Sequence, residues 1–505
     1  MSAPVTVGLV SLGCAKNAVD LQVIAAHLLR QGFVITPDEG AADVLIVNTC
    51  AFIESAREEA LREIGNALAV KADPKSACRL VVVSGCFAQR YPGLLAERFG
   101  ASGGVDAVVG IDRLDSVGDT LRALLADRPA KPARGRRNSP CAALPQTVVV
   151  DVPSGEPHRL FSSPLPEFTV LPGPAAYLKI AEGCSHVCAF CAIPGIRGRL
   201  RSRAREDILD EARALLASGI RELIVIAQDV TAYGRDLKRA KGASPLVALL
   251  RELDALEEVG GPFWIRLLYG HPNGVTDDLL AWMATSRHAC RYLDVPLQHS
   301  HPDVLRAMRR AETVPAVEAL AARARAAVPG VCLRTTFLVG FPGETPEMFD
   351  HLMSFLEAQR YDHVGAFAFS PEEGTAAVAL PTPVPPRIAE QRRRRLMKRQ
   401  EALVKERNKA RVGTEGIVLV ESVEQTDEDG DGGEFVAFGR SEFQAPEDVD
   451  GHTVVRGIPQ RAARSDFAKN LRFGKIAGTF VRVRYASFRS YDLLAEYLGP
   501  AESLR

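Results

Sequence analysis

Six of the ten cysteines fall into two sets of three, and their spacing is that of metal-binding thiolates. The amino-terminal set comprises Cys14, Cys50 and Cys86, which follow one another at intervals of 36 residues. The loop set comprises Cys184, Cys188 and Cys191 in the run EGCSHVCAFCAIPG, with the spacing C-x3-C-x2-C. Three thiolates can hold three irons of a 4Fe-4S cube and leave the fourth iron open. Each set therefore predicts one such cluster.

Zinc is the main alternative for the loop set. A closed structural zinc site needs four ligands, and no nearby fourth cysteine completes this one. His186 lies inside the loop, but its closeness in sequence to Cys184 and Cys188 is awkward for a zinc ligand. For the amino-terminal set the alternative is three small buried thiols, which are common at strand ends. The zinc interpretation would make the chain a non-catalytic RNA-binding scaffold.

The amino-terminal cysteines each end an apolar run, namely VTVGLVSLG, DVLIVNT and RLVVVSG. Helical patterns such as LQVIAAHLLRQGF and SAREEALREIGNALA fill the gaps, which predicts a βαβαβ order and a parallel sheet. Ligands of open parallel sheets gather at the carboxyl ends of the strands. The three cysteines should therefore converge on one site, although they are far apart in the chain.

The loop set, with the aromatic Phe190 before its last cysteine, resembles the signature of the radical SAM superfamily. SLGCAKN at 11–17, NTCAFIESA at 48–56 and SGC at 84–86 resemble the amino-terminal domain of the methylthiotransferases. This resemblance extends over nearly the whole chain. It implies two 4Fe-4S clusters, one of which binds S-adenosyl-L-methionine at Cys184, Cys188 and Cys191. The other, at Cys14, Cys50 and Cys86, would supply sulfur to the substrate.

The length of 505 residues exceeds what one core usually supports, and 47% hydrophobic residues are ample for several domains. The predicted class is α/β, with four segments. These are an amino-terminal doubly wound parallel-sheet domain, a Pro- and Arg-rich linker, a partial (β/α) radical SAM barrel and a small antiparallel TRAM-like β-barrel, at 1–127, 128–172, 173–410 and 411–500.

Six apolar runs in the central segment predict parallel strands that alternate with helices: 177–183, 221–229, 263–270, 292–298, 331–340 and 363–370. Polar residues at their ends are expected to contact S-adenosylmethionine. They are Gln228, Asp229, Gln298, His299 and the turn 339–345. The turn 339–345 could be a structural turn without a ligand role, and His299 could be a buried side chain with its hydrogen bonds made and no catalytic role. Cys78, Cys141, Cys290 and Cys332 match no cluster spacing.

A helix is predicted over 387–411, with eleven basic and three acidic residues. It could be a nucleic-acid-binding stripe or a connecting helix that docks through Leu396, Met397, Leu403 and Val404. The following segment, 412–500, holds ten basic and fifteen acidic residues, so a polyanion is a poor partner for it.

Methylthiotransferases modify either a tRNA adenosine or an aspartate of ribosomal protein uS12. AFIESA, AQDVTAYG and FSPEEGTAA resemble the ribosomal-protein enzymes. The tRNA enzymes have an Arg-Pro-Gly-Thr-like sequence where this chain has PEEGT at 371–375. The resemblance implies radical transfer of a methylthio group to the aspartate β-carbon, with tRNA modification as the alternative. The expected partners are uS12 on the ribosome and an electron donor such as flavodoxin or ferredoxin.

The cysteines lack a disulfide-dense pattern, and no apolar run approaches the ~18 residues of a membrane span. The start of the chain lacks the basic and apolar regions of a signal peptide. We therefore expect a cytoplasmic enzyme with no membrane partner.

Overall fold

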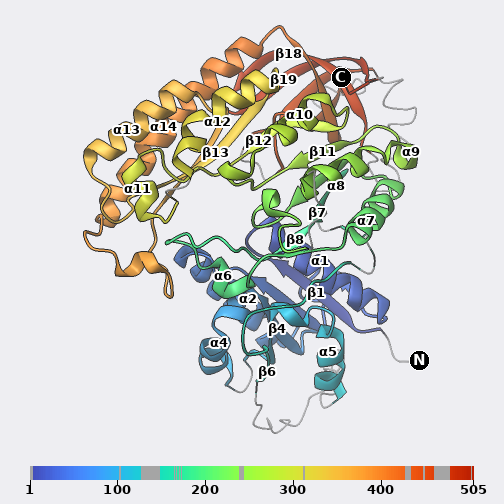
Figure 1. Ribbon diagram of the computed structural model, residues 1–505. Coiled ribbons are helices and arrows are strands. Elements are labelled where there is room, and N and C mark those ends of the chain that lie inside the picture. The colour runs from blue at the N-terminus through green and yellow to red at the C-terminus, as the bar shows by residue number, and fades with distance from the viewer. Residues whose placement is uncertain are drawn as a thin grey trace.

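A computed structural model describes residues 4–101, 104–126, 148–163, 165, 168–169, 171, 173–237, 244–310, 313–426, 434–446, 450–459, 478–501 and 503–504. The amino-terminal domain, a central half-barrel and a carboxyl-terminal barrel follow one another from bottom to top of the view (Figure 1). The three expected architectures are confirmed. Cys141 and the acidic run 427–433 lie outside the described residues.

The amino-terminal domain is a six-stranded parallel sheet with helices on both faces. Its strand order is β2 (Val34–Thr36), β1 (Thr6–Ser11), β3 (Val44–Thr49), β4 (Leu80–Gly85), β5 (Ala107–Val109) and β6 (Val149–Asp151). Its helices are α1 (Ala15–Arg30), α2 (Glu54–Ala72), α3 (Cys86–Arg90), α4 (Pro92–Phe99) and α5 (Val117–Ala126), with a 3-10 turn at Ile111–Arg113.

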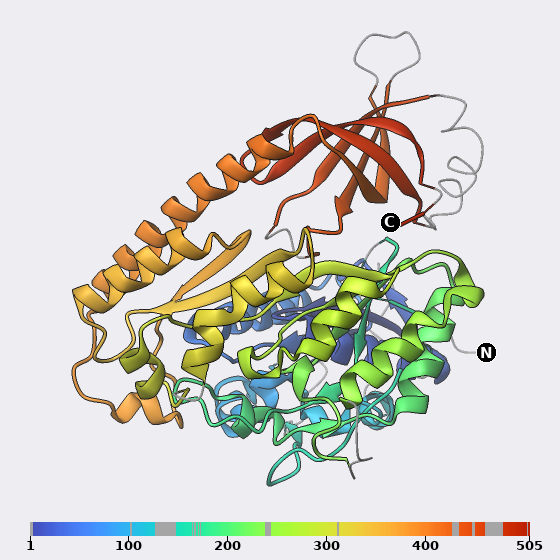
Figure 2. The same ribbon diagram turned by 45° about the horizontal axis from the view of Figure 1, so that its top comes forward.

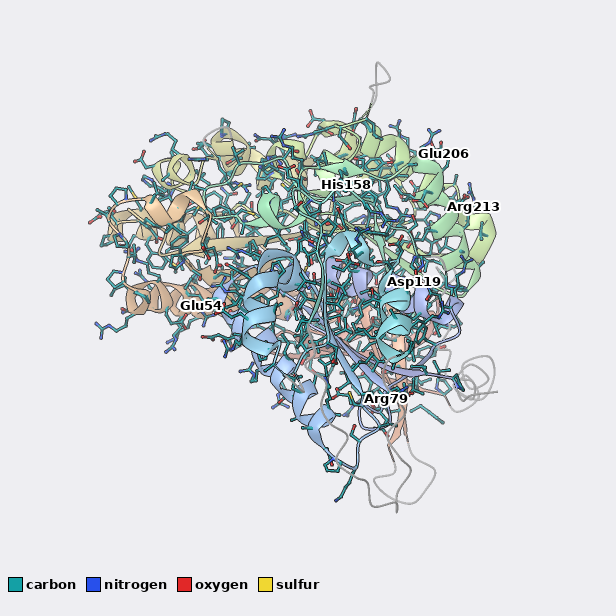
Figure 3. The ribbon with its side chains drawn as sticks, turned by 90° about the horizontal axis from the view of Figure 1, so that it is seen from below. Glu54, Arg79, Asp119, His158, Glu206 and Arg213 are labelled. Carbon is teal, nitrogen blue, oxygen red and sulfur yellow. The ribbon has the colours of Figure 1, made fainter. Side chains whose placement is uncertain are left out.

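Two separate apolar cores explain this layering. One buries Ile24 of α1 and Leu121 of α5 against the sheet, and the other buries Ile64 of α2 and Leu95 of α4. Figure 3 views this domain from below, with Glu54 at the start of α2 and Asp119 on α5 labelled. Strand β6 lies within the expected linker and extends the sheet beyond β5.

The central domain is a second six-stranded parallel sheet, and its two edge strands do not pair with each other. The strands are β14 (His363–Ala368), β13 (Cys332–Val339), β12 (Ala289–Asp294), β11 (Trp264–Leu267), β10 (Glu222–Ile226) and β7 (Ala175–Lys179). Helices α7 (Arg205–Ala217), α8 (Pro245–Asp254), α9 (Glu257–Gly260), α10 (Asp277–Thr285), α11 (Pro302–Ala307), α12 (Val314–Ala327) and α13 (Pro346–Gln359) alternate with them. A two-stranded ladder of β8 (Ala181–Glu182) and β9 (Arg201–Ser202) flanks α6 (Ile193–Arg197).

The inner face of this half-barrel is covered by the other two domains. Ile226 and Trp264 of the sheet pack in one core with Val19 of α1 and with Leu419 and Phe480 of the carboxyl-terminal barrel. The amino-terminal domain therefore sits directly against the sheet, and the cysteine sets of the two domains can meet.

Helix α14 (Pro386–Arg411) runs from the half-barrel to the carboxyl-terminal barrel (Figure 2). Leu396, Leu403 and Val404 are buried on one face, and Met397 is partly buried against the core. Several of its arginines pair with acids on neighbouring segments, for example Arg395 with Asp350 at 3.0 Å. These contacts favour the connecting-helix interpretation.

The carboxyl-terminal barrel is closed by five strands in the order β15 (Glu415–Thr426), β16 (Glu434–Ser441), β17 (Thr453–Ile458), β19 (Asp492–Pro500) and β18 (Phe480–Arg489). The short β17 was not expected from the sequence. It pairs parallel with β19, whereas the other neighbours are antiparallel. Its six residues carry only a brief alternating pattern, which gives little sequence signal.

Candidate active site between the two domains

The amino-terminal cysteines stand at the carboxyl ends of three adjacent strands. Cys14 is the N-cap of α1 after β1, Cys50 directly follows β3, and Cys86 is the first residue of α3 after β4. Because β1, β3 and β4 are parallel neighbours, their ends lie at one edge of the sheet. The structure thus brings these cysteines together as expected.

Asn17 links the three strand ends. Its Nδ2 donates hydrogen bonds to the carbonyl oxygens of Leu12 at 3.1 Å and Thr49 at 2.9 Å. Its Oδ1 accepts from Cys86 Sγ at 3.3 Å. Since these three partners lie at the ends of β1, β3 and β4 in turn, the Asn17 side chain links all three strand ends.

Glycine is required before two of these cysteines. Gly13 has φ +93°, and a Cβ there would lie 2.6 Å from the Cys50 Cβ. Gly85 has φ +89°, and a Cβ there would lie 2.5 Å from the Thr49 carbonyl oxygen. Both positions combine a left-handed backbone with a close approach that only glycine allows.

The loop set lies beyond β8 in the central domain. The Cys184 N–H donates to the Gly198 carbonyl oxygen at 3.0 Å, and the Ala189 N–H donates to that of Met308 at 3.0 Å. These backbone bonds anchor the loop on both sides of Cys188.

One cavity is lined by all six cysteines. Its volume is about 610 Å³, within the range of about 300–1,000 Å³ typical of ligand sites. The first sheet contributes one wall, and the strand ends of the half-barrel contribute the other. The two sets therefore face a common space.

The donor set of this cavity fits iron better than zinc. Thiolates are the soft ligands that iron–sulfur clusters prefer. Three cysteines that bind three different irons need not meet at one point, whereas a zinc site surrounds a single ion.

Burial controls the protonation of these thiols. It raises the pKa of Cys86 and of Cys191 to about 12 each, and that of Cys184 to about 11. The pKa of Cys50 is also raised by burial. These thiols are therefore protonated at neutral pH unless a metal displaces the proton.

Three of the polar residues expected to contact S-adenosylmethionine line the cavity, namely Gln228, Asp229 and Gln298. His299 does not, because its side chain is fully buried behind the strand. The turn 339–345 is also absent from the lining, and the Phe341 amide donates to Glu344 Oε2 at 3.1 Å within that turn.

Several cavity residues were not found from the sequence. His271 stacks on His186 with ring centroids 4.0 Å apart, and His186 Nε2 lies 2.8 Å from Asp229 Oδ2. Lys16 Nζ lies 2.9 Å from the centre of the Tyr269 ring. The sequence gives no signal for these contacts, because each contact joins two segments that are far apart in the chain.

Backbone geometry also marks this site. Tyr269 has φ +68° and Gln298 has φ +72°, conformations that cost free energy in residues other than glycine. Both residues follow strands of the half-barrel and line the cavity. Strained residues of this kind cluster at functional sites.

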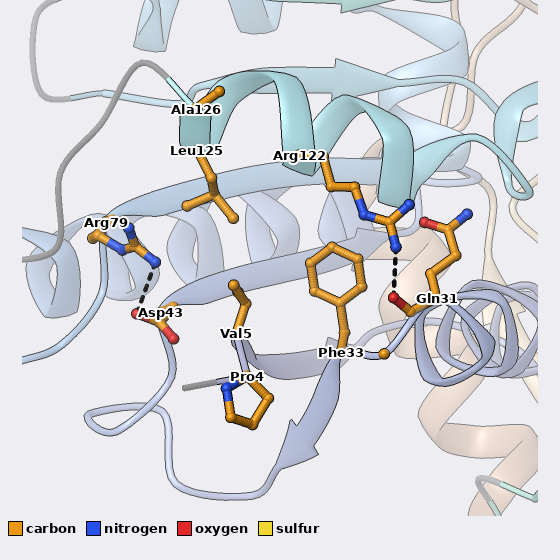
Figure 4. Close-up of a pocket in the computed structure, with 10 residues that line it drawn as sticks. Pro4, Val5, Gln31, Phe33, Asp43, Arg79, Arg122, Leu125 and Ala126 are labelled. Carbon is orange, nitrogen blue, oxygen red and sulfur yellow. Dashed lines mark hydrogen bonds and ion pairs between the residues drawn. The ribbon is translucent and has the colours of Figure 1, made fainter. Parts of the chain in front are cut away.

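The remaining described cysteines, Cys78, Cys290 and Cys332, are buried and outside the cavity lining. A second hollow of about 600 Å³ lies at the opposite end of the first sheet (Figure 4). It contains an ion pair of Arg79 with Asp43 at 3.1 Å but no cysteine. Its edges at Pro4 and Ala126 adjoin residues outside the described part of the chain.

Comparison with known proteins matches each domain to a family. Residues 6–110 match the model described as uncharacterized protein family UPF0004, residues 178–356 match the radical SAM superfamily and residues 412–498 match the TRAM domain. The ribosomal protein uS12 methylthiotransferase RimO of Syntrophus aciditrophicus (strain SB) is 40% identical over 494 residues, which cover 98% of each chain. The chain belongs to the RimO family.

The RimO protein of Desulforudis audaxviator (strain MP104C) is also 40% identical, over 98% of this chain and 97% of its own. A solved structure of the radical S-adenosylmethionine methyltransferase TsrM from Kitasatospora setae is 16% identical, with a TM-score of 0.48. The match covers 84% of this chain and 78% of TsrM. Family membership identifies a radical SAM enzyme that uses S-adenosylmethionine and a 4Fe-4S cluster. Among the described residues, no helix is both long and apolar enough to cross a membrane.

Proposed function

We propose that this chain is a two-cluster methylthiotransferase that modifies an aspartate of ribosomal protein uS12. The observation that carries the proposal is the single cavity lined by two sets of three cysteines from two domains. One set at the loop of a radical SAM domain suffices for radical chemistry. We assign the second set, which lines the same cavity, to the cluster that supplies the sulfur.

The six cysteines have separate roles in this proposal. Cys184, Cys188 and Cys191 hold the cluster that binds S-adenosylmethionine, and Cys14, Cys50 and Cys86 hold a second cluster. When bound, the two clusters supply the electron for cleavage of S-adenosylmethionine and the sulfur for transfer. We propose domain limits at 1–127, 173–410 and 411–500, with 128–172 as the connection, although β6 lies in that connection.

The protein orients and encloses these groups. Gln228, Asp229 and Gln298 offer polar side chains on the cavity wall beside the loop set, where they can position S-adenosylmethionine. Phe52 and Phe367 line the cavity and remain 37% and 54% exposed, so they mark where it meets solvent. We place the approach of the substrate at this apolar rim, which also limits the entry of water.

The substrate assignment rests on the relatives and on charge. The relatives at 38–40% identity carry the name ribosomal protein uS12 methylthiotransferase. The segment 412–500 has ten basic against fifteen acidic residues, which suits a basic ribosomal protein better than tRNA. We further propose a cytoplasmic location and an electron donor such as flavodoxin or ferredoxin.

Two cysteine variants test the division of roles. We expect Cys188→Ala to abolish release of 5′-deoxyadenosine from S-adenosylmethionine. Cys50→Ala should retain this release and lose transfer of sulfur. Cys290→Ala, a buried cysteine outside the cavity, is the control and should keep both activities. Equal loss of cleavage in Cys50→Ala and Cys188→Ala would contradict the assignment.

The substrate is tested by mass spectrometry after anaerobic incubation with S-adenosylmethionine, sulfide and a reductant. We expect a methylthio addition on a uS12 aspartate and none on bulk tRNA. Addition to tRNA adenosine alone would keep both cluster assignments and overturn the substrate.

A further inference from the structure

Arg197 crosses from the central domain into the amino-terminal domain. It is the last residue of α6, six positions after Cys191, and its side chain is only 2% exposed. Its Nη2 lies 3.3 Å from Cys86 Sγ. A residue that follows the loop set thus donates a hydrogen bond to a cysteine of the amino-terminal set.

The other contacts of Arg197 hold the guanidinium in place. Nη2 donates to Asn17 Oδ1 at 2.6 Å and to Asp20 Oδ2 at 2.8 Å. Nη1 donates to Glu182 Oε1 at 3.0 Å. Asn17 also contacts the three strand ends that carry the amino-terminal set. Its hydrogen bond to Arg197 therefore fixes the guanidinium relative to that set.

The buried charges around Arg197 are balanced without Cys86. Lys179 Nζ contacts Asp20 Oδ1 at 2.7 Å and Glu182 Oε2 at 2.8 Å. Two cations and two carboxylates therefore cancel, so a thiolate at Cys86 adds a negative charge beside the guanidinium. Arginine stays protonated in proteins, so its charge persists in every state of the site.

A hydrogen bond to a ligating sulfur lowers the free energy of the more electron-rich form of a cluster. Reduction potentials of iron–sulfur clusters are set by net charge, by hydrogen bonds to the sulfurs and by solvent exposure. The Cys86 sulfur has both a donor and a positive charge at this position, in a site that is almost closed to water.

We propose that Arg197 is a positioning residue that orients Cys86 and raises the midpoint potential of the cluster held by the amino-terminal set. This inference rests on the second cluster of the proposed function. It also gives the two sets a direct link, because α6 begins two residues after Cys191 and ends at the contact with Cys86.

The loop set has a weaker counterpart. Arg310 Nη1 lies 3.7 Å from Cys188 Sγ, and Arg310 is 5% exposed. Each set thus has one buried arginine, but the shorter contact belongs to Cys86. We expect Arg197 to affect the amino-terminal cluster and to leave the other cluster unchanged.

The test uses full-length protein in which Cys184, Cys188 and Cys191 are replaced by alanine, so that only the amino-terminal cluster remains. Redox titration followed by electron paramagnetic resonance then gives one midpoint potential. Arg197→Gln should raise the ratio of oxidised to reduced cluster tenfold at a fixed potential, which corresponds to a downward shift of the midpoint potential by about 59 mV for one electron. Arg197→Lys keeps the charge and should give a smaller downward shift.

Arg203→Gln is the matched control. The Arg203 side chain is 3% exposed and pairs with Asp207 at 2.8 Å and Glu211 at 2.6 Å, and it contacts none of the cysteines that the structure describes. We expect an unchanged potential in this variant. Iron lost in Arg197→Gln alone would support the positioning role, and the potential of Arg197→Lys would then test the charge effect.

The two levels of the proposal fail in different ways. If the triple-alanine protein binds no iron–sulfur cluster while wild type binds one, the second cluster is wrong. If the cluster forms and its potential is the same in Arg197→Gln, Arg197→Lys and Arg203→Gln, the role of Arg197 is wrong and the two-cluster assignment stands.

Discussion

Glu372 joins the two domains in a hollow next to the six-cysteine cavity, where it shares the lining with Phe52 and Phe367, and its replacement should loosen this contact. The carboxylate is 2% exposed and accepts from the Glu54 N–H at 2.9 Å, from Arg90 Nη1 at 3.2 Å and from Arg57 Nη1. All three donors belong to the amino-terminal domain, close behind Cys50 or Cys86. Glu372→Gln keeps the shape of the side chain and removes its charge.

The expected cost follows from the partners that lose a carboxylate. Breaking a buried ion pair costs about 3–5 kcal/mol when one partner is left behind. We take the lower value of about 3 kcal/mol, because Arg57 is 21% exposed and solvent screens it. With about 1.4 kcal/mol for each factor of ten, local opening should increase roughly 100-fold.

Hydrogen–deuterium exchange of peptides that span 51–57 measures this opening, since the Glu54 amide is itself a donor to Glu372. We expect about 100-fold faster exchange there in Glu372→Gln. Glu373→Gln is the control, because Glu373 is exposed and contributes only its backbone carbonyl to Arg90. Exchange equal to wild type in both variants would refute the fastening role.

Three further changes should have distinct outcomes. Burial lowers the pKa of His299 to about 3, whereas the pKa of histidine in the unfolded chain is about 6.5. The free energy of unfolding should therefore be lower by about 2 kcal/mol at pH 5 than above pH 6.5 because of this residue. In urea denaturation His299→Gln should remove this loss, and a pH dependence equal to that of wild type would contradict the prediction. Glu222→Gln should destabilise by about 3–5 kcal/mol, because the buried carboxylate accepts from Arg266 and Arg440 at 2.5 Å each. Limited proteolysis should then cut the carboxyl-terminal barrel faster. Resistance equal to that of wild type would contradict a role of Glu222 in holding this barrel to the central domain. Gly85→Ala places a Cβ 2.5 Å from a backbone oxygen and should lower bound iron by about four per chain, whereas full iron content would show that the turn can relax.

Strand-end positions could be predicted because they depend on local patterns. Apolar runs mark β1, β3 and β4, and Cys14, Cys50 and Cys86 directly follow them. A parallel sheet then brings the cysteines together without further information. The loop set needed even less, since its three cysteines are contained in eight residues.

Contacts between remote segments could not be predicted in this way. Arg197 and Cys86 are 111 residues apart, and nothing in either local sequence signals their hydrogen bond. Arg57 and Glu372 are 315 residues apart and meet only because the amino-terminal domain packs against the half-barrel. A single sequence without aligned relatives carries no trace of such pairs.

The roles of His299 and of helix α14 were left open by the local sequence, and only the fold distinguishes between the alternatives. His299 follows a strand in the same way as Gln298, but its ring points into the core and Nδ1 accepts from the His301 N–H at 2.9 Å. The apolar stripe of α14 and its basic residues gave conflicting signals. The structure shows which face is buried, with Leu396 and Leu403 inside.

Iron content is the measurement that tests the central claim most directly. Protein reconstituted anaerobically should bind about eight irons per chain. Replacement of Cys14, Cys50 and Cys86 by alanine, or of Cys184, Cys188 and Cys191, should each leave about four. About four irons in wild type, unchanged when the amino-terminal set is replaced, would contradict the account of two clusters around one cavity.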